Sequence, residues 1–188
     1  MMARYDCWTH VTTRHGLAAD EVISALQKTI RRGNAETAVR FGYEMYITSQ
    51  AMEDYLWLRL AVISVEDVGL AAPMLPALIH ALDAQRRQMP YGSGDRMLFA
   101  IHAIRTLCDS EKTRSNDQLL NLVMGEFERG EIPEIPDVAL DMHTARGQRM
   151  GRGLQHFLTE ASQVQPPWTG EEPDYLTRLL DALPQEKE

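Results

Sequence analysis

Apolar residues recur at intervals of three and four along most of the chain, and this spacing is typical of amphipathic helices. Ile23, Leu26 and Ile30 begin the pattern, and a glycine–asparagine pair at 33–34 separates that helix from the next. The stretch 53–73 is the most apolar, so we expect it at the centre of a helical core. No alternating strand pattern occurs. The sequence therefore predicts an all-α fold, a bundle of roughly seven to nine helices.

Helix starts are marked by capping residues and prolines. Asp20 and Asn34 are expected to cap the first two helices. Pro73 and Pro76 suit the first turn of a later helix, where a missing amide costs little. Asp95 is expected to open the helix after that.

The helix expected to end at Gly130 has an apolar side that we expect to face the core. Its members are Leu119, Leu120, Val123 and Phe127. The next residues, EIPEIPD (131–137, here the EIPEIPD connector), place two prolines three residues apart, which favours an extended segment. Helices are then expected at 154–161 and 175–183. We therefore divide the chain into an irregular N-terminal arm (1–19), one helical domain (20–163), and a proline-rich linker with a short helix and charged tail (164–188).

Composition narrows the classes of protein. A chain with 44% hydrophobic and 24% charged residues is globular. Its net charge of -8 argues against binding nucleic acid over the whole surface, although a local basic patch remains compatible with it. Cys7 and Cys108 lack CxxC spacing, and we expect reduced thiols in a cytoplasmic protein. We see no signal peptide and no apolar run of about 20 residues that would span a membrane.

Nucleotide and thiol chemistry are both unsupported. No GxxxxGK[ST] loop occurs, so we expect no ATP hydrolysis and no cofactor. Cys108 adjoins an apolar helix end and is interpreted as a core residue rather than a nucleophile. The histidines His10, His15 and His80, like His102, show no metal-binding spacing.

Two short stretches with acidic residues, Glu66-Asp67 and Asp141 to His143, are the candidates for catalysis or ligand binding. Glu66 and Asp67 are adjacent, so on a helix they point about 100° apart and do not converge on one ion. The structural alternative is a helix cap or a pair with a neighbouring arginine. Asp141 and His143, with His156 beyond them, suggest a metal site only weakly, and Thr144 is more simply a helix cap.

Arginines recur every three residues in a glycine-rich stretch. Arg146, Arg149 and Arg152 would form one ridge on a helix, with Lys112 and Arg114 as further basic residues. Such a ridge suits phosphates or an acidic partner. The alternatives are a solvated face, salt bridges between subunits, or a loop with exposed amides.

Several segments resemble one known family. ISALQKTIRRGN (23–34), SVEDVGLAAP (64–73), Met89-Pro90 and KTRSN (112–116) are similar to the C-terminal domain of the RarA/MgsA replication-associated recombination ATPases, relatives of Werner-helicase-interacting protein. The resemblance covers 22–153. Within the second segment, the positions that match the family turn are Ser64, Glu66, Asp67, Gly69 and Pro73.

The resemblance implies an all-helical, tetrameric domain related to the collar of clamp loaders. The family's AAA+ ATPase module has no counterpart in these residues, and DMHTARGQRMGRG (141–153) departs from the family pattern. We therefore expect a non-enzymatic oligomerisation and interaction module near DNA replication, recombination or repair, with DNA or a separate AAA+ ATPase as partner. The alternative is a small helical enzyme or ligand-binding protein, with a polar pocket formed by Glu66, Asp67, Asp141 and His143.

Overall fold

The computed structural model describes residues 7–167, 169–170 and 174–183, and these form two compact units: unit 1 ends at Arg129 and unit 2 begins at Gly130. All regular secondary-structure elements of the described residues are helices. The only β-bridge among these residues is an isolated one between Thr12 and Ala18. The predicted all-α class is confirmed.

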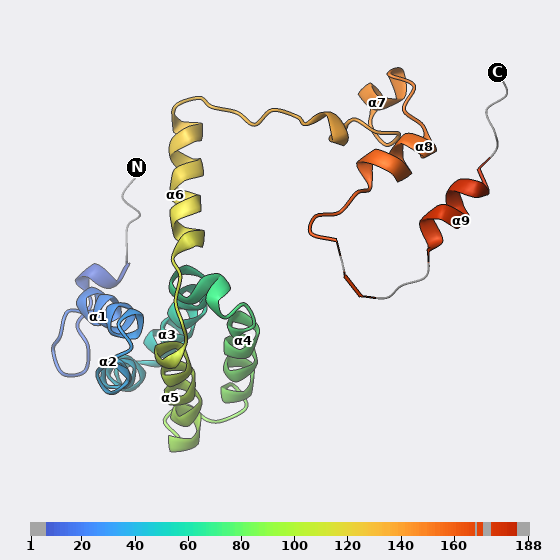
Figure 1. Cartoon of the computed structure of the whole chain (residues 1–188). Helices are drawn as coiled ribbons and strands as arrows, with labels where there is room; N and C mark the ends of the chain where they lie inside the picture. Colours follow the sequence, from blue (N-terminus) through green and yellow to red (C-terminus); the bar gives the residue numbers. More distant parts are fainter. Residues whose placement is uncertain (1–6, 168, 171–173, 184–188) are drawn as a thin grey trace. The chain divides into compact units, whose positions relative to one another are not determined.

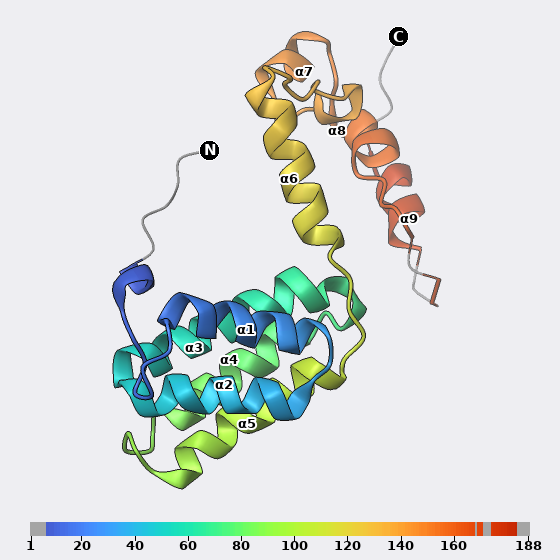
Figure 2. The ribbon, with the colours of Figure 1, turned by 90° about the vertical axis from the view of Figure 1, so that its left-hand side faces the viewer.

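Unit 1 is built from six α-helices and three short helical turns (Figure 1). In chain order they are η1 (Cys7–His10), α1 (Ala19–Arg31), α2 (Ala35–Thr48), α3 (Gln50–Ile63), the π-helical turn η2 (Ser64–Val68), η3 (Gly69–Ala71), α4 (Leu75–Arg86), α5 (Gly94–Asp109) and α6 (Ser115–Glu128). Helices α1 to α5 form the bundle, and α6 projects from it (Figures 1 and 2).

The helix starts agree only in part with the sequence prediction. Asn34 caps α2 by accepting a hydrogen bond from the Thr37 amide at 3.3 Å, as expected. The expected Asp20 cap is wrong, because α1 begins at Ala19 and the Asp20 carboxylate accepts from the Glu21 amide instead. Helix α5 begins one residue before Asp95, with the Ser93 hydroxyl as its cap.

The core lies around α3, as the apolar stretch predicted. Met52, Leu56, Leu60 and Ile63 of α3 are all fully buried. At Gly42 of α2, a Cβ atom would lie 2.5 Å from the Cδ1 atom of Ile104 on α5. A small residue is therefore required where α2 and α5 approach each other.

A buried ion-pair network joins α3, α4 and α5, and the sequence pattern did not reveal it. Glu53, which is 1% exposed, accepts from Nε of Arg96 at 2.8 Å and lies 3.2 Å from Nη1 of Arg86. Arg96 also donates to the carbonyl of Met89 at 2.7 Å. Because a buried charge is costly without partners, these ion pairs fix the relative positions of the three helices.

The described part of the N-terminal arm folds back onto the bundle. The ring centroids of Trp8 and Tyr55 lie 5.2 Å apart, so the arm packs against α3. Nδ1 of His15 lies 2.6 Å from the Glu44 carboxylate of α2. Residues 1–6 of the predicted arm lie outside the described residues.

Unit 2 contains short helices separated by turns. They are η4 (Asp137–Ala139), α7 (Ala145–Arg149), α8 (Leu154–His156), the π-helical turn η5 (Phe157–Ala161) and α9 (Tyr175–Asp181). The expected single domain 20–163 is thus divided between Arg129 and Gly130. The division falls at the start of the EIPEIPD connector, whose prolines cannot continue a helix.

No helix in the described parts of the chain has the length and apolar content needed to cross a bilayer.

Candidate functional site

Three family-like segments that are distant in sequence meet at one polar cluster in unit 1. The first supplies side chains from α1, the second from η2, and the third from the turn before α6. Arg59 of α3 joins them. We call these six side chains the polar cluster: Gln27, Arg31, Arg59, Glu66, Asp67 and Arg114.

Asp67 is the centre of the polar cluster. Its side chain is 0% exposed, and it accepts from Nε of Arg31 at 2.6 Å and from the Gln27 amide at 3.1 Å. Nε of Arg114 lies 3.3 Å from the same carboxylate. The hydrogen bond that Arg31 donates to Asp67 raises the pKa of Arg31 above its ordinary value, so this guanidinium stays charged.

Glu66 lies at the more exposed side of the polar cluster. Its carboxylate accepts from the Gln27 amide at 2.9 Å and from Nη2 of Arg31 at 3.3 Å. Arg114 lies 3.4 Å away, and Arg59 lies 3.9 Å away. Both acidic side chains are thus paired with arginines, as the structural alternative predicted, and neither carboxylate is left free for acid–base or metal chemistry.

Hydrogen bonds to backbone carbonyls also join η2 to the start of α6 and the turn before it. The Thr113 amide donates to the carbonyl of Val68 at 3.2 Å, and Asn116 Nδ2 donates to the carbonyl of Val65 at 3.1 Å. Gly69 has a φ of 56°, and a Cβ there would lie 2.9 Å from the Thr113 carbonyl oxygen. The polar cluster and these contacts together hold the start of α6 against η2 and η3.

The apolar residues of α6 are exposed, so the expectation that they face the core is wrong. Leu119, Leu120, Val123 and Phe127 are 60%, 59%, 38% and 56% exposed. Leu122 and Met124 are exposed as well. The spacing correctly predicted an apolar helix face, but spacing does not specify which surface covers that face. We call these six side chains the α6 apolar face.

The expected arginine ridge is divided by the backbone. Helix α7 carries Arg146 and Arg149, both exposed, and ends there. The chain then turns at Gly151, which has a φ of 72°. Arg152 lies beyond this turn, where it pairs with the Asp137 carboxylate at 2.6 Å.

The remaining basic candidates also have internal contacts. Lys112 donates to the carbonyls of Cys108 and Ser110, each at 2.7 Å, and so closes the end of α5. Arg114 belongs to the polar cluster and also pairs with Asp117 at 2.6 Å.

Asp141 and His143 pair with each other inside unit 2. Nδ1 of His143 lies 3.0 Å from the Asp141 carboxylate, and this hydrogen bond lowers the pKa of Asp141. Thr144 caps α7 by accepting from the Gly147 amide at 3.0 Å, as predicted. Among the described residues, no group of three or more histidine, cysteine, aspartate or glutamate side chains is arranged to hold a metal ion.

Cys108 is a core residue, as expected. It is 4% exposed, and burial raises the pKa of its thiol to about 11. A thiol with this pKa is protonated at neutral pH and is a poor nucleophile. The side chain of Cys7 lies outside the described part of the structure.

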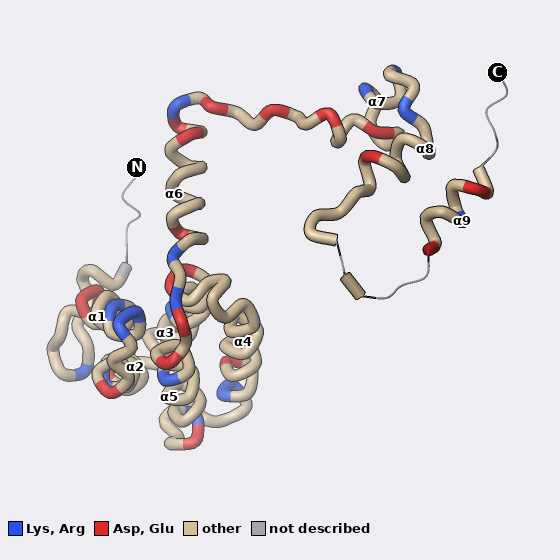
Figure 3. Tube along the Cα trace, viewed as in Figure 1, with Lys and Arg blue, Asp and Glu red and all other residues tan. Residues whose placement is uncertain are grey.

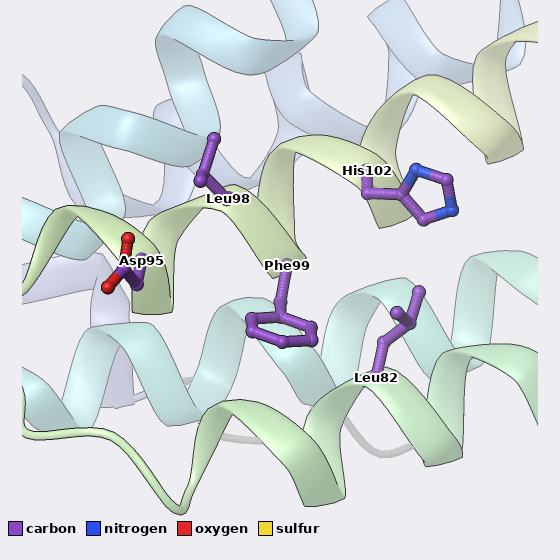
Figure 4. A pocket seen from close by; sticks show the side chains of 5 residues that line it. All are labelled: Leu82, Asp95, Leu98, Phe99 and His102. Atoms are coloured by element: carbon purple, nitrogen blue, oxygen red, sulfur yellow. The ribbon is translucent and has the colours of Figure 1, made fainter.

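A pocket with a volume of about 300 Å³ lies between α4 and α5 (Figure 4). Leu82 and Phe99 face each other across it, while Asp95 and His102 stand at opposite ends. Active sites and specific ligand sites bring polar groups together around an apolar cavity. Because the two polar residues do not converge, this pocket lacks the arrangement of a catalytic site.

The bundle, the polar cluster and the projecting α6 define an all-α protein whose most distinctive feature is an exposed apolar helix. No family model matches the chain. A distant relationship is found with replication-associated recombination protein A of Bacillus subtilis (strain 168), at 29% identity over 144 residues. The match covers 76% of this chain and 33% of that relative, so the chain spans about a third of the relative's length.

Proposed function

We propose that this chain is a non-catalytic oligomerisation and interaction module that acts in DNA replication, recombination or repair. The observation that carries the proposal is the exposed α6 apolar face. The helix that carries it projects from the bundle (Figure 2). The distant relationship to replication-associated recombination protein A supports the biological context.

The α6 apolar face has the composition of an interface. Leu119, Val123 and Phe127 follow one line along the helix, and Leu120 and Met124 lie beside them. Burying such a side chain stabilises an assembly by about 1.5–3 kcal/mol relative to leaving it in water. A contiguous exposed apolar surface of this kind marks an interaction site.

The occupant we propose is α6 of a second copy, and we favour a homotetramer because the family resemblance implies one. Two apolar helices pack on each other without needing complementary charges. The polar cluster holds the start of each α6, so self-association would not have to order that end of the helix first.

Light scattering on the full chain at micromolar concentration tests this proposal. For the wild type we expect a mass above 21.3 kDa, near four times that value for the favoured tetramer, and for the double variant Leu120→Gln, Phe127→Gln we expect a monomer. Leu58→Gln is the matched control, because Leu58 is 56% exposed on α3. A monomeric wild type would refute the proposal. So would an α6 double variant with unchanged mass and a lowered melting temperature, because α6 would then be covered by its own chain.

We further propose Arg146 and Arg149 as the contact with DNA or with a separate AAA+ ATPase in the cytoplasm. Figure 3 shows basic positions in the region of α7, and the side chains of Arg146 and Arg149 are exposed. Phosphate contacts make affinity fall steeply with salt. The double variant Arg146→Ala, Arg149→Ala should therefore weaken binding to a single-stranded oligonucleotide and reduce its salt dependence. Unchanged binding would remove DNA from the proposal.

A further inference from the structure

A groove between α2 and α5 of unit 1 has no role in the self-association proposed above. Its volume is about 500 Å³. It is lined by Ala35, Glu36, Val39, Arg40, Ile101 and Arg105. Both arginines are exposed, and within the described residues neither has an ion-pair partner. The groove thus combines an apolar floor with two unpaired cations.

The EIPEIPD connector presents the complementary chemistry. Ile132 is 81% exposed and Ile135 is 65% exposed. Pro136 has φ -66° and ψ 149°, the values of a polyproline II helix. A polyproline II conformation has three residues per turn, so a connector that adopts it places the isoleucines on one edge and Glu131 and Glu134 on the adjacent edge. Figure 3 shows acidic positions spaced along the connector.

We propose that the EIPEIPD connector of a second copy binds in the α2–α5 groove. Glu131 and Glu134 would meet Arg40 and Arg105, and the isoleucines would cover the apolar floor. This inference rests on the proposed self-association, and it adds a second contact between copies that involves unit 2.

Charge and apolar content together favour this occupant. Nucleic-acid phosphates match the arginines but leave the floor formed by Val39 and Ile101 in water. An extended proline-containing segment is already ordered before it binds, which reduces the entropic cost of docking. Glu36 is the one acidic side chain of the groove and would repel the connector. Glu36→Gln should therefore strengthen the contact, while Arg105→Gln should weaken it.

Thiol crosslinking between two full-length chains tests the contact. One chain carries Glu36→Cys and the other Ala139→Cys, and both carry Cys7→Ser. Cys108 is buried and should not react. With a short bismaleimide, we expect a heterodimer at twice the chain mass. Arg87→Cys on α4, a position 62% exposed, replaces Glu36→Cys in the control and should give little product.

Charge reversal supplies the specificity test. Adding Arg40→Glu and Arg105→Glu to the groove chain should lower the crosslinking yield about tenfold. Adding Glu131→Arg and Glu134→Arg to the connector chain should then restore the yield. Restoration is not expected if the arginines act only on the stability of the bundle.

Light scattering on the same samples separates the possible failures. An oligomer without the crosslink would overturn this inference and leave the proposed self-association intact, whereas a monomer would overturn both. A chain carrying both cysteines that crosslinks only within itself would overturn docking between copies. A different result would assign the groove to nucleic acid instead. In that case no crosslink forms, a single-stranded oligonucleotide binds the wild type, and this binding is lost in the variant Arg40→Glu, Arg105→Glu.

Discussion

Asp67 and Arg31 form an ion pair at 2.6 Å across 36 positions of sequence, with the carboxylate fully buried. A buried carboxylate of this kind is retained only where its partners are fixed in place, because unpaired it would cost several kcal/mol. The pair therefore connects α1 to the turn that supports α6.

Removing the carboxylate should be strongly destabilising. Asp67→Ala leaves two guanidinium groups without their central partner, and we expect a loss of about 3–5 kcal/mol in the free energy of unfolding. Urea denaturation followed by circular dichroism measures this loss. Glu66→Gln, at a carboxylate that is 24% exposed, should cost about 1 kcal/mol or less and serves as the matched control. Equal losses in the two variants would contradict a central role for Asp67.

Gly69→Ala should detach the start of α6. The added methyl group meets the Thr113 carbonyl at 2.9 Å and also strains a backbone with a φ of 56°. We expect destabilisation by about 1–3 kcal/mol, with faster hydrogen exchange in residues 112–128. Gly92→Ala is the control for backbone strain alone, because Gly92 has a φ of 90° but open space around it. If Gly92→Ala produced the same increase in hydrogen exchange in residues 112–128, the contact with Thr113 would not be the cause of that increase.

The thiol of Cys108 should be unreactive in the folded protein. Burial raises its pKa to about 11, so almost no thiolate forms near pH 7. In a Cys7→Ser background, we expect labelling by a disulfide reagent to be slow in buffer and rapid in denaturing urea. Rapid labelling under native conditions would show that the end of α5 opens readily.

Acid should weaken the interaction of Asp83 with its arginines. Burial alone would raise the pKa of Asp83, but hydrogen bonds from Arg87 and Arg86 outweigh it, so the pKa is lowered from 3.8. A carboxylate with a lowered pKa stabilises the fold above its unfolded pKa, and that contribution is lost as the pH falls through the folded value. We expect the stability difference between wild type and Asp83→Asn to be constant near neutrality and to shrink below pH 3.8. A difference that did not change with pH would exclude this coupling.

The sequence predicted the positions of the helices better than the contacts that the helices make with one another. Periodicity and caps located the core helix, the Asn34 cap and the Thr144 cap, because these depend on neighbours within a few residues. The partners of Asp67 come from positions 36 and 47 residues away, so local spacing gave no direct sign of them. The available signal was indirect: three of the four segments that resemble one family, 23–34, 64–73 and 112–116, meet in the polar cluster.

The errors have a common physical cause. An apolar face predicts burial, but among the described residues the core of the bundle contains no residue of α6, and the apolar face of α6 is exposed. Likewise, three arginines at a spacing of three predict a ridge only if the helix continues. Gly151 ends that regularity, and Arg152 pairs with Asp137 instead.

Because the α6 apolar face adds nothing to the bundle core, its side chains can change without a large penalty in folding. The residues that hold α6 in place belong to a different set, centred on Asp67 and Gly69. Changes in the surface of α6 are therefore physically separable from changes that affect the fold. Relatives of this chain can be expected to share the attachment of this helix while differing in the surface it presents.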